Sequence, residues 1–496
     1  MSQLINGRYQ LHGKLGKGGM GAVYRATDKL TDTIVALKRV TSHAGSSAKG
    51  KDLQISLANE FKALASLRHP NIIPVLDYGF DKGLPYFTMQ YIPFARTITA
   101  VGRDAPHQEK IKLLIQMLQA LAYLHRRGII HRDLKPENAL VDETGNLMLL
   151  DFGLAEENPK AAEDGRISGT LAYIAPEVLQ GEAPTEASDL YAVGLIAYEI
   201  FSGAYPFDEK NVVTLVTDVI RTMPDIDELD ISEAFADIIA RLLSKSSKDR
   251  YRQSTRVMEA LADAKLMDLR DEDRDNWNSY LHAAKFVGRE DELQKLESAL
   301  HNALDGQGSA WLIGGESGVG KSRLLGEMQV RAMVQGALTI TGQGVLGGGL
   351  PYQLWREPVK RLALVTEIGE LDAVILKEIS PELDRILGYP IGDASEVEQD
   401  AAQKRLIAAI IALFRTYGKP IVLLMEDLQW TSESTEVLKQ LSNAVADLPL
   451  LILATYRSDE RPDMPEELSN MRSIMLNRLN NAEISDLSES MLGSAG

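Results

Sequence analysis

The sequence contains no cysteine among its 496 residues. Disulfides, zinc sites built on thiolates and cysteine nucleophiles are therefore excluded, and the chain has no thiol-based redox switch. The sequence also lacks an excess of basic residues, since the formal net charge is -17 and the pI is near 5.1. A general nucleic-acid binder needs a basic face to neutralise phosphates, so this balance argues against one, although it leaves a local basic patch open.

Long apolar runs are missing as well. No stretch of about 18 apolar residues could cross a bilayer, and residues 1–8 lack the apolar core of a signal peptide. We therefore expect a soluble cytoplasmic protein with no membrane partner. The remaining composition, 45% hydrophobic and 25% charged, is typical of globular domains, and 496 residues suggest roughly three units at about 150 residues each.

A polar stretch at residues 131–138, followed thirteen residues later by Asp151, carries chemistry suited to phosphoryl transfer. Transfer from ATP needs little covalent help, so catalysis reduces to placing a hydroxyl, a triphosphate and metal ions in line. Asp133 can take the proton of the substrate hydroxyl, and Lys135 can reach the transferring phosphate. Asn138 and Asp151 offer the oxygen ligands that Mg²⁺ requires.

Upstream of this stretch, short apolar runs broken by glycine predict an antiparallel sheet over residues 9–91. A glycine-rich turn at residues 16–23 would let backbone N–H groups close over phosphates, although a tight hairpin without a ligand explains these glycines about as well. Lys38 on the next strand favours the phosphate interpretation. Glu60, on a predicted helix at 57–67, is the candidate carboxylate that keeps this lysine charged. Solvated surface charges are the alternative for both.

A change of pattern follows this sheet. From Lys110 to Arg127 apolar residues recur with a period near 3.6, and Gly128 comes next. This pattern predicts a helix that ends at the glycine. The sheet therefore gives way to a helical lobe, and a cleft between two such lobes is a natural place for a nucleotide and convergent polar groups.

These motifs resemble, in order and spacing, those of the eukaryotic-like protein kinases. The matching residues are Gly16, Gly18, Gly21, Val23, Lys38, Glu60, residues 131–138, Asp151-Phe152-Gly153 and Ala175-Pro176-Glu177. The resemblance covers about residues 9–265 and implies an α+β bilobal protein kinase fold. Lys135 and Thr170 match the Ser/Thr branch of the family.

The resemblance also implies roles for single residues. The expected catalytic residues are Lys38, Glu60, Asp133 and Lys135, with Mg²⁺ on Asn138 and Asp151. The expected ATP-binding residues are Gly16, Lys17, Gly18, Gly19, Gly21, Val23, Lys38 and Tyr91. Asp189 is expected to brace the backbone of the catalytic loop, with a helix cap as the alternative. Arg250 is expected to pair with Glu177, with a solvated surface arginine as the alternative. His131 is expected to pack and to bond backbone groups rather than to act as a base.

The segment at residues 152–168 holds a single hydroxyl side chain, Ser168. Arg132 in the catalytic loop needs an anion to order such a segment. Anions that require no modification are supplied there by Glu156, Glu157, Glu163 and Asp164. We therefore expect a kinase that is constitutively ordered or governed by its other domain, with Ser168 and Thr170 as candidate phosphorylation sites.

A second nucleotide site follows a predicted strand at residues 309–313. Residues 315–322 fit the eight-residue phosphate-binding loop in full and open a helix. Backbone N–H groups and the helix N-terminus would cradle the phosphates, Lys321 would reach the β and γ oxygens, and Ser322 would hold Mg²⁺. The ATP-binding residues expected here are Gly315, Gly318, Gly320, Lys321 and Ser322.

Two further apolar strands accompany this loop. Residues 420–425 form a near-continuous apolar run, typical of a buried parallel strand, and are followed by Glu426 and Asp427. One of these acids can bind Mg²⁺ through water and the other can polarise the attacking water, but the sequence does not say which. The strand at 450–455 leads to Arg457, which is either a sensor of the γ-phosphate or a solvated strand end.

This half of the chain resembles the signal-transducing branch of the AAA-like ATPases over about residues 284–496. The matching residues are 286–290, the phosphate-binding loop, residues 426–430 and Tyr456-Arg457. The resemblance implies an α/β three-layer P-loop NTPase (AAA-like) fold and places residues 287–289 near the adenine, with a helix-capping turn as the alternative. Such proteins continue into further modules, whereas this chain stops at Gly496 after a predicted helical lid at 481–492. We therefore expect a truncated domain.

A charged stretch at residues 268–275 marks a boundary between the two halves. The sequence predicts a kinase domain at 1–265, a linker at 266–283 and an AAA-like ATPase domain at 284–496. The expected activity is transfer of the γ-phosphate of ATP to Ser or Thr hydroxyls of protein substrates. ATP and Mg²⁺ are expected at both sites, and the second site would act as a switch through shape change or self-association. The alternative is a signalling scaffold whose P-loop domain binds ATP with little hydrolysis.

Overall fold

The computed structural model describes residues 3–18, 21–40, 48–151, 169–208, 211–266, 286–346, 350–394, 398–431 and 434–492. These residues fall into two compact units. The first unit draws on residues 1–58, 76–89 and 286–484, and the second on residues 59–75, 90–285 and 485–496. The N-terminal sheet therefore belongs to the same unit as the P-loop domain. The domain boundaries predicted around the linker stay predictions, because residues 267–285 lie outside the described ranges.

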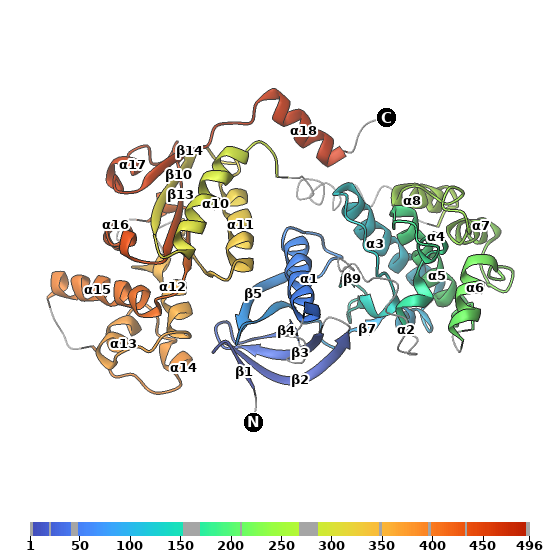
Figure 1. The fold of residues 1–496 in the computed structure, drawn as a ribbon, viewed down its shortest axis with the longest axis horizontal. Helices are drawn as coiled ribbons and strands as arrows, with labels where there is room; N and C mark the ends of the chain where they lie inside the picture. The colour runs from blue at the N-terminus through green and yellow to red at the C-terminus, as the bar shows by residue number, and fades with distance from the viewer. Residues whose placement is uncertain are drawn as a thin grey trace. The chain divides into compact units, whose positions relative to one another are not determined.

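The first unit begins with an N-terminal sheet in the strand order β1-β2-β3-β4-β6-β5 (Figure 1). Its strands are β1 (Leu4–Ile5), β2 (Tyr9–Gly18), β3 (Gly21–Asp28), β4 (Thr33–Arg39), β5 (Val75–Asp81) and β6 (Leu84–Gln90). The first four strands pair antiparallel with their neighbours, as the broken apolar runs predict. Tyr9, Val35, Leu37 and Tyr86 lie in a small buried core on this sheet. Helix α1 (Ala48–Ala65) contains most of the helix predicted at 57–67.

The P-loop domain, residues 286–484, is built on a parallel sheet in the order β11-β12-β13-β10-β14. Its strands are β10 (Ser309–Gly315), β11 (Leu338–Gln343), β12 (Ile421–Glu426), β13 (Leu450–Arg457) and β14 (Arg472–Met475). The three predicted apolar strands are β10, β12 and β13. Each is nearly continuous in apolar residues because both faces of a parallel sheet are covered.

Helices cover both faces of this parallel sheet (Figure 1). One face packs against α10 and α11, and receives Val422 and Leu424 of β12. The other face packs against α12 to α16, and receives Leu423 and Met425. Successive strand residues point to opposite faces, so a single apolar strand supplies both cores, and the predicted three-layer α/β fold is confirmed. The helices are α10 (Glu290–Leu304), α11 (Lys321–Val334), α12 (Gln353–Ala363), α13 (Glu370–Lys377), α14 (Leu383–Leu387), α15 (Gln399–Tyr417), α16 (Ser434–Asn443) and α17 (Met464–Glu467), with 3-10 turns η5 (Leu428–Trp430) and η6 (Val445–Asp447).

The second unit is mainly helical. Its elements are β7 (Arg96–Thr97), α2 (Ile98–Gly102), α3 (His107–Arg126), η2 (Pro136–Asn138), β8 (Ala139–Val141), β9 (Leu147–Leu149), η4 (Gly169–Tyr173), α4 (Pro176–Leu179), α5 (Glu186–Ser202), α6 (Val212–Arg221), α7 (Glu233–Leu242) and α8 (Ser254–Asp263). Helix α3 packs against α5 and α8. It confirms the helix predicted from Lys110, and it ends before Gly128, whose φ of 71° suits a glycine. The last helix, α18 (Asn481–Leu492), coincides with the predicted C-terminal helix.

Candidate active sites

A short hairpin in the second unit positions the two predicted metal ligands of the kinase. Strands β8 and β9 pair antiparallel, and Asp142 closes their turn by accepting the backbone N–H of Thr144 at 2.8 Å. At the open end of the hairpin, the N–H of Leu150 donates to the carbonyl oxygen of Asn138 at 2.9 Å. The hairpin thereby brings Asn138 beside the residue that precedes Asp151.

Asp133 lies at the centre of a small polar cluster. The Nζ atom of Lys135 donates to its two carboxylate oxygens at 2.9 and 2.8 Å. The Nδ2 atom of Asn138 donates to Oδ2 of Asp133 at 2.8 Å and to its backbone oxygen at 2.7 Å. Because the nitrogen of this amide is used in that way, Oδ1 of Asn138 is the atom that can meet a cation.

Asp189 on α5 holds the backbone of the catalytic loop. Its carboxylate accepts the N–H groups of His131 at 2.9 Å and Arg132 at 3.0 Å, and it contacts the His125 ring at 2.8 Å. Arg132 has a φ of 67°, a strained conformation that these bonds help to maintain. Burial raises the pKa of Asp189, but the contact with His125 and the backbone N–H of His131 more than offset this and lower it below its ordinary value. The predicted brace is confirmed.

One other structural prediction is confirmed in the second unit, and a second is supported by burial. Glu177 and Arg250 form a buried ion pair with an N–O distance of 2.7 Å. His131 is completely buried, and this burial lowers its pKa. A neutral, inaccessible ring is in keeping with the packing role expected for His131.

The two charged residues predicted to accompany the glycine-rich turn, Lys38 and Glu60, are buried. Lys38 on β4 is 7% exposed, lies opposite Val23 of β3, and has its Nζ atom 5.8 Å from the ring centre of Phe87. Glu60 is 1% exposed. The solvated alternatives for Lys38 and Glu60 are therefore excluded. Their pairing would join the two units and stays a prediction.

Two predicted phosphate-binding glycines differ in their surroundings. A Cβ atom at Gly21 would run into the backbone oxygen of Arg39, whereas one at Gly16 would meet nothing within 4 Å. Gly21 is thus required by the close approach of its strand to β4, whether or not a nucleotide binds. The sequence pattern alone cannot separate these two reasons for a glycine.

Several predicted residues lie at the edges of the described ranges. Lys17 and Gly18 end β2, Tyr91 follows β6 and is half-buried, and Thr170 lies in η4. The residues outside the described ranges are Gly19, Phe152, Gly153, Glu156, Glu157, Glu163, Asp164 and Ser168. The predictions made for these residues outside the described ranges therefore stay predictions.

The phosphate-binding loop at residues 315–322 connects β10 to α11. Gly315, Gly318 and Gly320 have φ angles of 156°, 77° and 102°, which L side chains rarely adopt. These glycines therefore allow the turn that aims backbone N–H groups at an anion. Helix α11 begins at Lys321, so its N-terminus faces the same loop.

Lys321 is held inside this loop. Its Nζ atom donates to the backbone oxygens of Gly315 and Glu316, both at 2.7 Å. Burial, followed by the nearby Arg457, lowers the pKa of Lys321. Ser322, one residue further into α11, is exposed. A bound phosphate would offer the ammonium group of Lys321 a stronger acceptor than the carbonyl oxygens of Gly315 and Glu316.

The predicted sensor Arg457 lies next to the phosphate-binding loop. The parallel pairing of β10 with β13 places it opposite Gly315. Its guanidinium is 4.9 Å from the ring centre of Trp430 and donates to Glu460 at 2.7 Å. Arg457 therefore lies beside the phosphate-binding loop, but its guanidinium contacts Trp430 and Glu460. It is not a fully solvated strand end.

The two predicted acids lie where β12 ends. Asp427 has a φ of 58°, and its carboxylate accepts hydrogen bonds from Gln429 at 2.9 Å and from Gln343 at 3.5 Å. Glu426 is the last residue of β12 and is half-buried. Both are placed at the carboxyl edge of the sheet as expected, and the choice between them for Mg²⁺ stays open.

Two further arginines contact the phosphate-binding loop. Arg289 precedes α10, is 7% exposed, and donates to the backbone oxygens of Val319 and Asn477. Arg478 donates to the carboxylate of Glu316 at 2.8 Å. Arg289 belongs to the motif at residues 287–289, and its bond to Val319 places it at the phosphate-binding loop without deciding between the adenine and capping alternatives. Arg478 belongs to no motif, so the sequence carried no signal for it.

Clusters of metal-binding side chains and membrane-spanning helices are both absent from the described ranges. Within them, no group of three or more His, Asp or Glu side chains could hold a metal ion. Mg²⁺ in phosphoryl-transfer sites takes most of its ligands from water and substrate phosphates, so the pair Asn138 and Asp151 still suits its chemistry. In the same ranges, every helix is too short or too polar to cross a membrane.

Comparison with known proteins agrees with both folds. Residues 9–263, which are just over half of the chain, match the family model of the protein kinase domain, and the chain therefore belongs to the protein kinase family. Residues 285–453 match the model of an AAA ATPase domain. The predicted combination of a kinase with an AAA-like ATPase domain is confirmed.

Two similar curated proteins are bacterial kinases. The chain is 32% identical over 297 residues to the probable serine/threonine-protein kinase pknA2 of Bifidobacterium longum, which covers 58% of this chain and 38% of the relative. It is 36% identical over 249 residues to the DNA damage-responsive serine/threonine-protein kinase RqkA of Deinococcus radiodurans, covering 48% and 36% of the two chains. The chain thus spans less than half the length of these relatives.

Proposed function

We propose that this chain is a serine/threonine protein kinase that transfers the γ-phosphate of ATP to protein hydroxyl groups. The observation that carries the proposal is the cluster around Asp133, whose carboxylate accepts hydrogen bonds from Lys135 and Asn138 next to Asp151. Such a cluster suits a reaction in which positioning and charge stabilisation supply most of the catalysis. Membership of the kinase family supports the same activity.

In this proposal the residues of the catalytic loop have separate tasks. Asp133 accepts the proton of the attacking hydroxyl. Lys135, which neutralises Asp133 in the present structure, shares its charge with the transferring phosphate. Asn138 and Asp151 would hold Mg²⁺, which when bound neutralises the phosphate oxygens.

The N-terminal sheet would bind the triphosphate. Lys38, buried on β4, is the proposed phosphate contact, and Glu60 is its proposed partner. The turn between β2 and β3, with Gly16 on one side, would cover the phosphates with backbone N–H groups. Thr170 and Lys135 support the Ser/Thr rather than the Tyr branch.

Transfer of labelled phosphate from ATP to a generic protein substrate tests the kinase assignment. Asp133→Asn keeps the size of the side chain but removes the base, so the rate is expected to fall by roughly 10²- to 10⁴-fold. Asp104→Asn, the same change at an exposed position, is the matched control and should leave the rate unchanged. Unchanged transfer in the Asp133→Asn variant would refute the kinase assignment.

We further propose that the P-loop domain binds ATP with Mg²⁺ and acts as a switch on the kinase. The three glycines with positive φ, the buried Lys321 and the helix N-terminus support nucleotide binding. The engagement of Arg457 with Trp430 and Glu460 favours the second candidate, a domain that binds ATP with little hydrolysis and acts through conformation or assembly.

Lys321→Ala separates these alternatives. The variant is expected to lose nucleotide binding at the P-loop domain, measured with a fluorescent ATP analogue in the Asp133→Asn background to reduce kinase turnover. Lys295→Ala, at an exposed position of α10, is the matched control. Hydrolysis that depends on Lys321 supports the ATPase switch, whereas binding without hydrolysis supports the scaffold.

Other parts of the proposal concern partners and location. Protein substrates follow from the proposed kinase activity, and self-association through the P-loop domain follows from the proposed switch. The cytoplasmic location predicted from the sequence also belongs to the proposal.

A further inference from the structure

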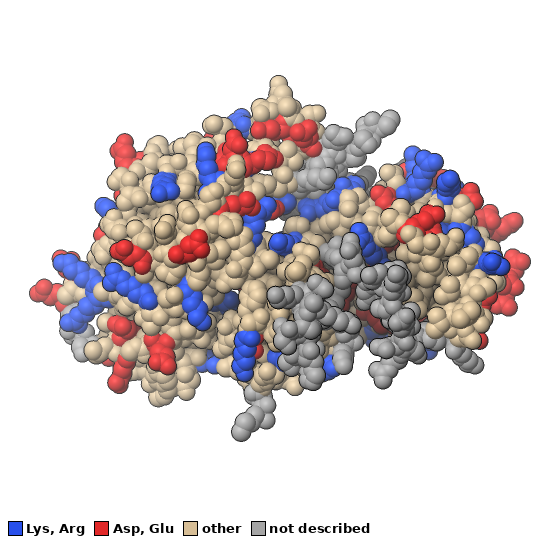
Figure 2. Space-filling model, viewed as in Figure 1, with Lys and Arg blue, Asp and Glu red and all other residues tan. Residues whose placement is uncertain are grey.

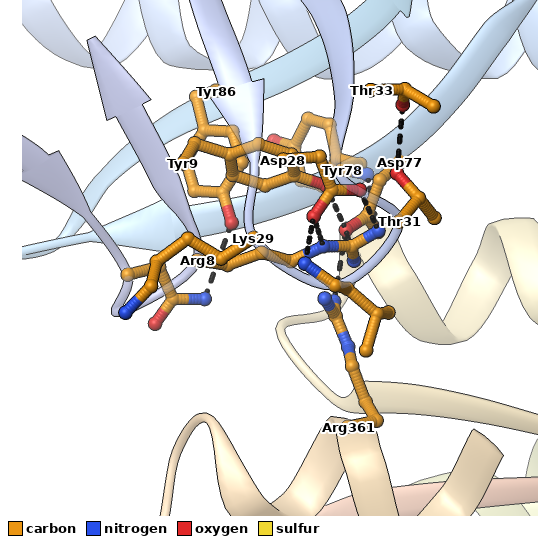
Figure 3. A network of polar contacts seen from close by, with 12 residues as sticks. Arg8, Tyr9, Asp28, Lys29, Thr31, Thr33, Asp77, Tyr78, Tyr86 and Arg361 are labelled. Atoms are coloured by element: carbon orange, nitrogen blue, oxygen red, sulfur yellow. Dashed lines mark hydrogen bonds and ion pairs between the residues drawn. The ribbon is translucent and has the colours of Figure 1, made fainter. Parts of the chain in front are cut away.

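A buried network of charges joins the N-terminal sheet to the P-loop domain within the first unit (Figure 3). Arg8 binds both carboxylate oxygens of Asp28 at 2.6 Å and donates to Asp77 at 2.7 Å. Arg361 of α12 donates to the same Oδ2 atom of Asp77 at 2.8 Å. Tyr9 adds a hydrogen bond to this atom from its hydroxyl at 2.8 Å. One carboxylate oxygen therefore collects donors from both parts of the chain.

The charges of this network balance only with the residue from the P-loop domain. The N-terminal sheet contributes two carboxylates, Asp28 and Asp77, which are 3% and 5% exposed, but a single guanidinium, that of Arg8. Arg361, 8% exposed, supplies the second positive charge. An unbalanced buried carboxylate is costly, so this face of the sheet requires a cation from outside.

The electrostatics of Asp77 agree with this requirement. Burial holds the pKa of its carboxyl group above the ordinary value, although Arg8 and the hydrogen bond from Tyr9 lower it. A further positive charge at 2.8 Å stabilises the ionised form.

Contacts around the network make this a surface rather than a single pair. The guanidinium of Arg385, on α14, donates to the backbone oxygens of Lys29 and Leu30 at 2.8 and 3.4 Å. A Cβ atom at Gly7 would lie 2.7 Å from the backbone oxygen of Leu364, so the two backbones approach closely there. Two helices of the P-loop domain thus meet one edge of the sheet: α14, and α12 together with its C-cap residue Leu364.

Each side of this surface is also connected to a nucleotide site. Helix α12 packs on β11, and Gln343 at the end of β11 donates to Asp427 at 3.5 Å. On the kinase side, Arg8 precedes β2 and Tyr9 begins it, and the other end of this strand carries Gly16, a proposed phosphate-binding glycine. Strand β2 and helix α12 therefore connect the Arg361–Asp77 contact to the two predicted sites.

We propose that the P-loop domain docks in cis on the Asp77 edge of the N-terminal sheet through Arg361, and that this docking transmits the nucleotide state of the P-loop domain to the kinase. The proposal rests on the switch function proposed above. The docking part of the proposal does not depend on that switch function, because docking can be measured without any enzymatic turnover. A continuous path of contacts between the two nucleotide sites does not by itself show energetic coupling between them. Docking and transmission are therefore measured in separate experiments.

Docking is tested by hydrogen exchange on the full chain. Arg361→Gln removes the cation and should speed exchange of the amides in β5 and at residues 29–30 by at least about tenfold. Arg385→Ala, an exposed and gentler change, should affect residues 29–30 in the same direction. Arg415→Gln, on the exposed side of α15, is the matched control. Unchanged exchange in a folded Arg361→Gln protein overturns the docking proposal, whatever the kinase does.

The cis assignment is tested by cross-linking a mixture of isotopically light and heavy chains. Cross-links between Lys29 and Lys360, both beside the contact, should join residues of the same isotope only. Mixed pairs would mean that a second copy provides the P-loop domain and would overturn the cis assignment.

Transmission is tested by combining variants. If the proposal holds, Lys321→Ala changes the kinase rate of the otherwise unaltered chain by about fivefold or more, and this change shrinks below about twofold in the Arg361→Gln background. An equal effect of Lys321→Ala in both backgrounds overturns transmission through this contact. Failure of the proposed switch would differ from this, because Lys321→Ala would then have no effect in either background.

Discussion

The guanidinium of Arg250 and the carboxylate of Glu177 form a bidentate ion pair, with N–O distances of 2.8 and 2.7 Å. The Arg250 side chain is completely buried and also donates to the backbone oxygens of Ser244, Ala187 and Lys245. One side chain therefore ties α4, the start of α5 and the segment after α7 together inside the second unit.

Removal of this arginine should destabilise the second unit strongly. Arg250→Ala leaves Glu177 buried without its cation, and the free energy of unfolding is expected to fall by about 3–5 kcal/mol. Urea denaturation followed by circular dichroism measures the loss. The matched control is Arg256→Ala, whose ion pair with Glu259 is 66% and 51% exposed and should contribute less than about 1 kcal/mol. Equal losses in the two variants would contradict the assignment of Arg250 as a structural centre.

The same pair predicts how stability depends on pH. Burial raises the pKa of Glu177, but the hydrogen bond and charge of Arg250 lower it below the ordinary value of 4.5. The unfolded chain then binds this proton more readily than the folded one. The stabilisation is complete above the ordinary pKa and is lost as pH falls through the folded-state pKa. We expect unfolding free energy to decrease on acidification below about pH 4.5, and less steeply in Glu177→Gln. Parallel pH profiles for the two proteins would be evidence against this linkage.

The brace on the catalytic loop should affect turnover more than ATP binding. Asp189→Asn exchanges a charged acceptor for a neutral amide, which weakens the bonds that hold His131 and Arg132 in place. A small displacement of Asp133 follows, and kcat is expected to fall by about 10²-fold while KM for ATP changes little. Steady-state kinetics with a melting curve checks this. A fall in kcat that is fully explained by unfolding, or a change confined to KM, would show that the brace does not position the base.

Two glycine substitutions should separate packing from nucleotide contact. Gly21→Ala meets the backbone of Arg39 and should destabilise the N-terminal sheet by about 1–3 kcal/mol, because neither strand can move aside easily. Gly16→Ala meets open space and should change stability by less than about 0.5 kcal/mol. Thermal melting of both variants without nucleotide provides the comparison. If Gly16→Ala proves as destabilising as Gly21→Ala, the packing explanation for Gly21 fails.

The parts of the site that could be predicted are those with local geometry. Asn138 and the residue before Asp151 are joined by a hairpin of adjacent strands, and Lys321 follows three glycines whose conformations shape the turn. In both cases the interacting residues are close in the sequence, so composition and spacing contain most of the information. The amphipathic period of α3 and the apolar runs of β12 and β13 are equally local signals.

Other relationships could not be predicted because they depend on which strands become neighbours. Arg457 adjoins Gly315 through the pairing of β10 with β13, yet its guanidinium turns to Trp430 and Glu460. The sequence left both a sensor and a strand end open for this residue. Only the packed surroundings decide the orientation of a long, flexible side chain.

The sequence by itself determined the family, the two nucleotide motifs and the chemistry available to each, because these reside in short segments with fixed spacing. Tertiary structure alone decided that Arg361 meets Asp77, since 284 positions separate them and neither belongs to a motif. It also decided that Gly21 is needed for strand packing. The physical reason is the same for both: burial of charge and close approach of backbones depend on neighbours that only the folded chain brings together.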